Sequence, residues 1–154
     1  MAIALKDRKD RTDPITLEYL YAALRIALLC AGLACMVGSA ISPWYLCFYS
    51  REAEAFTLLG MLEASKQFEG VSSYAVIGAL MAAVLWLCAA MRVGAKNEQV
   101  DSGMAALTAL TALVLFACHG SVSDAVGNAE AGPGLPLMLL SVAFSGTCAV
   151  KLRR

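Results

Sequence analysis

Cysteine and histidine are the side chains of this sequence with the widest chemistry, and their spacing decides which chemistry is available. The six cysteines are Cys30, Cys35, Cys47, Cys88, Cys118 and Cys148. None of them forms a C-x-x-C pair, which argues against a quinone-linked disulfide enzyme. Most lie inside apolar runs, where cysteine acts as a small hydrophobe. Cys47 and Cys118 differ because both are expected near the outer surface, so they form a candidate disulfide if that compartment is oxidising.

His119 is the only histidine and stands beside Gly120. One histidine excludes a bis-histidine haem within a single chain. A metal site needs several ligands, and no cluster of ligand residues surrounds His119. We therefore expect His119 to be a hydrogen-bonding residue at the outer interface. The sequence predicts no cofactor and no metal, and bound lipids are expected.

The elements that carry these residues are long uncharged runs. Hydrophobic residues make up 60% of the 154 residues and charged residues 16%. Four runs have no formal charge, at 26–50, 70–91, 102–123 and 131–150. Each is near the roughly 20 residues that a helix needs to cross a bilayer. The sequence predicts an all-α membrane protein, a bundle of four transmembrane helices. The predicted spans are about 19–44, 71–91, 103–119 and 135–150, in a single domain 1–154 that begins with a polar segment, 1–13.

The basic residues predict the orientation of the spans. With four spans, one side of the membrane receives nine of them: Lys6, Arg8, Lys9, Arg11, Arg92, Lys96, Lys151, Arg153 and Arg154. The loops on the other side hold only Arg51 and Lys66. Because loops rich in Lys and Arg stay inside, both termini are predicted on the inner side. The formal net charge of zero argues against nucleic-acid binding.

Arg25 is a candidate functional residue at the inner margin of the first span. Asp13 and Pro14 predict the start of this helix, as its N-cap and first helical residue. Arg25 then precedes the uncharged core. Intramembrane charges are often functional, but a marginal arginine can also reach the headgroups or stack on Tyr21 one turn earlier. We favour the second interpretation, in which Arg25 reaches the headgroups or stacks on Tyr21.

Trp44 and Tyr45 follow Pro43 about 19 residues after the uncharged core begins. This places them at the outer interface, where aromatic rings are apolar and their N–H and O–H groups are hydrated. Pro43 ends or kinks the helix. The sequence "WYLCFY" then predicts a short strand on the outer face, with a second apolar run in "AFTLLGML". Residues 54–66 fit either a strand or an interfacial helix. After the third span, the segment that begins at His119 is turn-rich and has no core of its own.

Small residues at four-residue spacing predict the helix-packing faces. They are Ala31, Cys35 and Ser39 in the first span, Ala75, Ala79 and Ala83 in the second, and Ser141, Ser145 and Ala149 in the fourth. Small side chains let helix backbones approach closely in lipid. These faces suit either the bundle itself or a helix of a partner.

The layout resembles the claudin-like superfamily of four-span proteins. The shared features are four spans, inner termini, a longer first outer loop and Trp44 just past the first span. The loop has no second Trp in "FTLLGML", and Cys47 is its only cysteine, so the claudin loop disulfide cannot form. The resemblance implies a left-handed four-helix bundle with a small outer strand layer, and lateral association in the membrane.

Apart from Arg25, the predicted spans hold no Asp, Glu, Lys or Arg, whereas a proton relay or ion-coupled transporter would need one. The sequence therefore predicts a non-catalytic structural or accessory subunit within a larger membrane complex, for example an energy-converting one. Its partners would be other integral membrane proteins and lipids. The compartment stays open among mitochondrial inner, photosynthetic and plasma membranes.

Two alternatives remain. A small transporter or channel component acting as an oligomer would lose flux on Arg25→Leu while its assembly stays intact. A membrane enzyme would require Cys47, Cys118 and His119 to converge at the outer face.

Overall fold

The structure, a computed structural model, describes residues 14–49, 52–63, 71–92, 101–126 and 129–149. These residues are mostly helical. The helices are α1 (Pro14–Ile41), α2 (Leu58–Glu63), α3 (Val71–Arg92), α4 (Asp101–Val126) and α5 (Gly134–Ala149). The strands are β1 (Tyr45–Tyr49), β2 (Glu52–Phe56) and β3 (Ala129–Ala131). The predicted polar segment 1–13 and most of the basic residues that predict the orientation lie outside the described residues.

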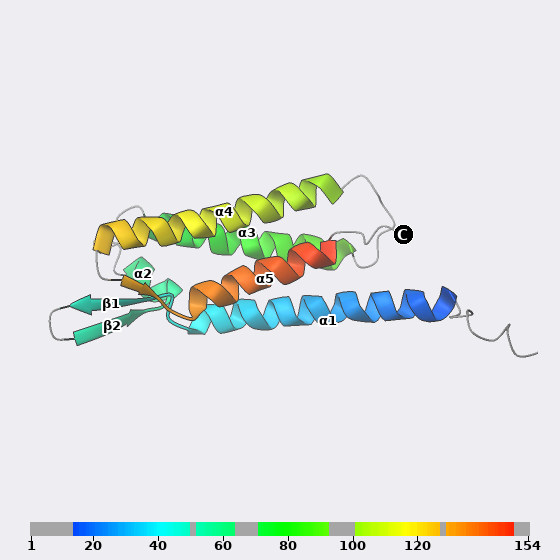
Figure 1. The fold of residues 1–154 in the computed structure, drawn as a ribbon, viewed down its shortest axis with the longest axis horizontal. Coiled ribbons are helices and arrows are strands. Elements are labelled where there is room, and N and C mark those ends of the chain that lie inside the picture. Colours follow the sequence, from blue (N-terminus) through cyan, green and yellow to red (C-terminus); the bar gives the residue numbers. More distant parts are fainter. Residues whose placement is uncertain (1–13, 50–51, 64–70, 93–100, 127–128, 150–154) are drawn as a thin grey trace, which may run out of the picture.

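Helix α5 organises the packing, because it contacts α1, α3 and α4. Helix α3 packs against α4 and more lightly against α1. Figure 1 shows the four helices side by side, with the strands and α2 gathered at one end. Helix α1 begins, and α5 ends, at the end opposite the sheet. This end is called the open end below.

Three helices in the described part of the chain are long and apolar enough to cross a membrane. Their apolar stretches are Tyr19–Ile41, Ser73–Arg92 and Ser102–Val122. The apolar stretch of α5, Gly134–Cys148, is shorter. Because a span needs about 20 apolar residues, the three long helices confirm a membrane-embedded protein.

The sheet has the order β2-β1-β3, and both pairings are antiparallel. Tyr45 pairs with Phe56 on β2 and with Ala131 on β3. The predicted strand after Trp44 is therefore present as β1, whereas most of the second apolar run, "AFTLLGML", lies in α2. Residues 54–66 fitted either a strand or a helix, and the described part of this range divides between the two, since β2 ends at Phe56 and α2 runs from Leu58 to Glu63. Residues 64–66 lie outside the described residues. The third strand, β3, is not part of the prediction.

The helix ends differ from the predicted spans in two places. Helix α1 begins at Pro14 as predicted and ends at Ile41, three residues before the predicted limit. The amide of Ser42 still donates to the carbonyl of Gly38 (3.0 Å), and the helix stops before Pro43. Helix α4 continues to Val126. The expected turn-rich connection from His119 onward is therefore wrong for residues 119–126, which are helical. The continuation buries Val122 completely.

Candidate functional site at the sheet end

Trp44 joins α1 to the sheet. Its side chain is fully buried, and its indole Nε1 donates to the carbonyl of Ser39 at 3.0 Å. Its amide donates to the carbonyl of Phe56 (2.8 Å), and its own carbonyl accepts from the amide of Gly132 (2.8 Å). One residue thus links the end of α1, the end of β2 and the segment before α5. The expected hydrated position of Trp44 is wrong, because the protein itself satisfies the indole N–H.

Two glycines let the chain before α5 pass this close to Trp44. The amide of Gly134 donates to the carbonyl of Pro43 at 2.9 Å. A Cβ on Gly134 would collide with Cδ1 of Trp44, and one on Gly132 would collide with the carbonyl oxygen of Pro43. Neither position therefore has room for a side chain, and this close approach seats the start of α5 against the end of α1.

Tyr45, Cys118 and His119, all singled out from the sequence, meet between β1 and α4. The Tyr45 hydroxyl donates to Sγ of Cys118 at 3.9 Å, a long contact of the kind that sulfur makes. The rings of Tyr45 and His119 stack, with centroids 6.2 Å apart and planes 12° from parallel. Tyr45 is buried, so the expected hydrated hydroxyl is wrong here too. Burial, followed by the nearby Cys118, raises the pKa of Tyr45 far above its usual value, and the phenol stays a proton donor.

His119 itself is half-buried, and its Nδ1 has no hydrogen-bond partner among the described residues. In the part of the chain that the structure describes, no three His, Cys, Asp or Glu side chains gather where a metal ion could bind. The cluster of Tyr45, Cys118 and His119 is thus a contact between the sheet and α4, in which Nδ1 of His119 has no hydrogen-bond partner among the described residues.

Cys47 and Cys118 are both fully buried free thiols, so the structure does not contain the predicted disulfide. Cys47 lies in the middle of the sheet, paired with Glu54 on β2 and Ala129 on β3. Burial, and secondarily the carboxylate of Glu54, raises the pKa of the Cys47 thiol. Because the thiolate is the nucleophile, Cys47 is an unreactive cysteine in the folded protein.

The burial and raised pKa of the Cys47 thiol predict how it reacts with a thiol reagent. At neutral pH, N-ethylmaleimide should leave Cys47 unmodified in the folded protein and should label it after denaturation. Because the pKa is raised, labelling of the folded protein should begin only at a pH above that of an ordinary thiol. Glu54→Gln removes one of the two causes and should shift this onset to lower pH. Peptide mass spectrometry measures the modification, and rapid labelling of folded protein at neutral pH would contradict the prediction.

At the open end, Arg25 is half-buried on α1. Its backbone carbonyl accepts a hydrogen bond from Sγ of Cys148 on α5 at 3.3 Å. Arg25 is therefore level with the last turn of α5, and it lies within the apolar stretch Tyr19–Ile41 of α1.

The predicted packing faces are enclosed to different degrees. Ser39, Ala75, Ser141 and Ser145 are buried, while Ala31, Cys35, Ala79 and Ala83 are half-buried. The side chain of Ala149 lies outside the described residues. Ser39 Oγ and Ser145 Oγ are buried without a hydrogen-bond partner among the described residues.

Glycines, which the sequence reasoning missed, lie at close helix contacts. A Cβ on Gly32 of α1 would lie 3.3 Å from Ser145 Oγ of α5. A Cβ on Gly78 would lie 2.6 Å from a methyl group of Leu115, and one on Gly146 would lie 2.6 Å from the methyl group of Thr108. The available signal was that Gly is the smallest residue and favours close helix approach in membranes.

Comparisons of the chain with protein-family models, with curated proteins and with solved structures each give no significant match. The class of the protein therefore follows from the fold itself. It is a transmembrane protein whose apolar helices carry a small three-stranded sheet at one end.

Proposed function

We propose that this chain is a non-catalytic structural or accessory subunit, which packs in the bilayer against helices of other integral membrane proteins. In this proposal the three long helices and the shorter α5 all span the membrane, with both termini on the inner side. The placement of basic residues supports that orientation, and so does the arrangement in which α1 begins and α5 ends at the open end. A larger membrane complex, such as an energy-converting one, is the proposed setting.

The observation that carries the proposal is the uncovered face of α1. In the apolar stretch of α1 only 11% of the residues are buried inside the chain, against 28% for α3 and 22% for α4. Helix α1 packs mainly on α5 and only lightly on α3. Most of its circumference is therefore available to lipid or to another protein.

The uncovered surface of α1 includes large exposed side chains such as Leu24 and Leu33, but one strip of it has residue types that favour a protein. Four exposed small residues recur at the spacing of one helix face: Ala23, Ala27, Cys30 and Ala34. We call them the α1 stripe. The stripe lies opposite the buried Leu29 and Gly32, which face the rest of the chain.

Helix α3 provides the contrast within the same molecule. Its exposed residues at comparable spacing are large: Ile77, Leu80, Val84, Leu87 and Met91. Large aliphatic side chains suit contact with lipid tails, whereas small ones let a second helix approach closely. The α1 stripe is therefore the proposed contact with a partner helix, and the α3 face is proposed to face lipid.

The test is co-purification from the native membrane in a mild detergent, with native electrophoresis and mass spectrometry of the proteins that migrate with the chain. Ala27→Leu combined with Ala34→Leu should reduce recovery of the partner about tenfold, which corresponds to about 1.4 kcal/mol. The thermal unfolding of the isolated chain should not change, because both positions are exposed.

Val84→Phe is the matched control, because it adds comparable bulk to the exposed face of α3. It should leave recovery of the partner unchanged. Migration of the unmodified chain as a discrete monomer or small homo-oligomer would overturn the proposal. Unchanged recovery with the double variant would place the partner on another face.

A further inference from the structure

The outer edge of β2 is an edge strand of the sheet. Because the strand order is β2-β1-β3, only β1 pairs with β2 among the described residues. The other edge of the sheet belongs to β3, and helix α4 contacts that strand. Figure 1 shows β2 on the side of β1 that is away from α4. The edge that α4 does not cover is therefore that of β2.

The hydrogen bonding shows which backbone groups of β2 point to this outer edge. The carbonyl of Phe56 accepts a hydrogen bond from the amide of Trp44 at 2.8 Å, so the backbone groups of Phe56 point toward β1. Along an antiparallel strand, successive residues point their backbone groups to opposite edges. Those of Glu54 therefore also point toward β1, whereas the N–H and C=O groups of Ala53 and Ala55 point to the outer edge.

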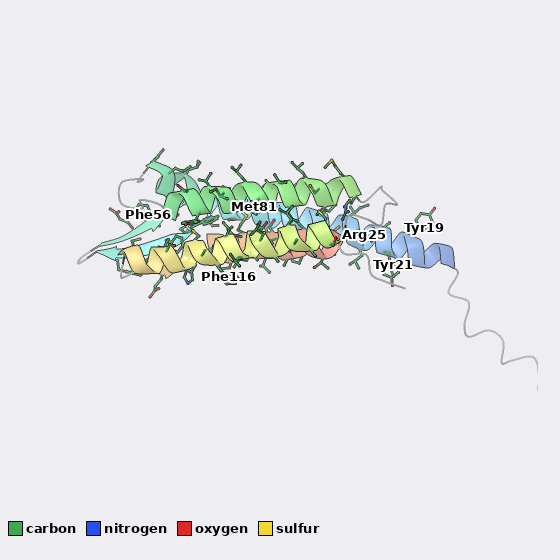
Figure 2. The ribbon with its side chains drawn as sticks, turned by 90° about the horizontal axis from the view of Figure 1, so that it is seen from above. Tyr19, Tyr21, Arg25, Phe56, Met81 and Phe116 are labelled. Carbon is green, nitrogen blue, oxygen red and sulfur yellow. The ribbon has the colours of Figure 1, made fainter. Side chains whose placement is uncertain are left out.

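The side chains of β2 leave this edge accessible from water. Glu54 and Ala55 are exposed. Phe56 packs against the buried core, and Figure 2 shows it where β2 meets the helices. Because an open sheet edge is too costly in hydrocarbon, this edge must lie outside the core of the bilayer. A molecule that pairs with it must be an extended chain that approaches through water, and not a transmembrane helix.

The sheet end of the chain is acidic. Residues 42–70, between α1 and α3, and residues 120–133, before α5, hold more acidic than basic residues. The acidic ones are Glu52, Glu54, Glu63, Glu69, Asp124 and Glu130, and the basic ones are Arg51 and Lys66. An antiparallel second copy of β2, aligned over its full length, would place two Glu54 side chains opposite each other, which destabilises a strand pair. A strand with basic residues at alternate positions would instead place opposite charges beside Glu54.

We propose that the outer edge of β2 binds an extended segment of a partner protein in which basic and apolar residues alternate. The segment would add a strand to the sheet, with hydrogen bonds to Ala53 and Ala55. Its basic side chains would share the face of Glu54. Its apolar side chains would share the opposite face with Phe48, which pairs with Ala53 and is 45% exposed. This contact rests on the proposed function, since it needs a partner protein, but it is separate from the α1 stripe.

The experiment is fluorescence anisotropy of short labelled peptides, titrated with the full chain in detergent. A peptide of alternating lysine and valine should bind, whereas the same peptide with glutamate in place of lysine should not. Residues directly opposite each other share a face, so the valines would lie opposite Ala53 and Ala55 and would make the hydrogen bonds. N-methylation of the valine amides should therefore abolish binding, and N-methylation of the lysine amides should preserve it.

Variants of β2 test the same contact from the side of this chain. Ala55→Pro removes an outward N–H and should weaken binding of the lysine peptide about tenfold. The sheet itself should remain, because proline is compatible with an edge strand at a position whose N–H faces outward. Glu54→Lys should weaken binding of the lysine peptide about fivefold and should favour the glutamate peptide. Glu130→Lys is the matched control, because it makes the same charge change on β3, and it should leave binding unchanged.

Equal binding of the lysine peptide by Ala55→Pro and by the unmodified chain would show that charge alone attracts it, and would exclude strand pairing. If Ala55→Pro does not fold, the two N-methylated peptides answer the same question with the unmodified chain. Self-association of the chain that Ala55→Pro abolishes would identify a second copy as the occupant and would contradict the proposal. Failure of the lysine peptide to bind the unmodified chain would overturn this inference alone, since co-purification tests the α1 stripe independently.

Discussion

Trp44→Ala is expected to destabilise the protein by about 3–5 kcal/mol, the range for removing a fully buried aromatic side chain. The side chain has no exposed surface, and its indole N–H is the donor to the carbonyl of Ser39. Removing it leaves a cavity between the end of α1 and the start of α5, and an acceptor without its donor. Thermal or denaturant unfolding in detergent measures the change in the free energy of unfolding.

Trp44→Phe measures the part of this cost that comes from the hydrogen bond, and Phe116→Ala is a control at an exposed position. Trp44→Phe keeps most of the packing and loses the N–H, so its cost should be about 1–3 kcal/mol, the penalty of an unsatisfied buried carbonyl. Phe116→Ala removes an aromatic ring that is 63% exposed and should change stability by no more than about 0.5 kcal/mol. If Trp44→Ala cost no more than Phe116→Ala, Trp44 would not be the joint between α1 and the sheet.

The sequence predicts the parts of the fold that local chemistry decides. Pro14 starts α1 because its ring favours the first helical turn and needs no amide partner. Pro43 ends it because the residue before a proline avoids the helical region. The aromatic and apolar run from Tyr45 to Tyr49 suits a pleated strand, and the structure has a strand there.

The elements that the sequence does not predict depend on tertiary partners. Ala129–Ala131 is a three-residue strand of Ala and Glu, which have low strand preference, and it forms because β1 offers a free edge. Helix α4 continues past Gly120 although glycine disfavours helices, and its continuation packs Val122 into the core. Neither partner is visible from the local sequence.

In the candidate site, too, the sequence identifies individual residues, whereas their contacts depend on tertiary packing. Sequence reasoning selected Tyr45, Cys118 and His119 one by one, but their meeting depends on how β1 packs on α4. On α1, small residues occur on several sides of the helix. Their spacing therefore predicts close packing without showing that Ser39 faces inward and Ala27 outward. Only the position of α5 distinguishes the two faces.

Gly134→Ala is expected to destabilise the protein by about 1–3 kcal/mol, the usual cost of forcing extra volume into a packed site. The new methyl group would collide with Cδ1 of Trp44 and would lie 2.9 Å from the carbonyl oxygen of Ser42. Two of the obstacles are backbone carbonyls, of Ser42 and Pro43, which cannot rotate away as a flexible side chain can. Relief would require the start of α5 to move away from the end of α1.

Gly120→Ala is the matched control, because it makes the same chemical change within α4 where a Cβ would meet nothing within 4 Å. It should stabilise the protein by up to about 1 kcal/mol, since alanine has the higher helix preference. The opposite signs of the two substitutions, measured by the same unfolding assay, would show that the contact with Trp44 decides the outcome. Two effects of the same sign and size would contradict it.

A double-mutant cycle tests the contact directly. In a Trp44→Ala background the indole is gone, and Gly134→Ala should cost less than in the unmodified chain, because only the carbonyls of Ser42 and Pro43 still oppose the new methyl group. Residues in contact usually couple by about 0.5–3 kcal/mol. Additive effects would mean that Gly134 and Trp44 act separately, and that the close approach of α5 depends on the backbone contacts alone.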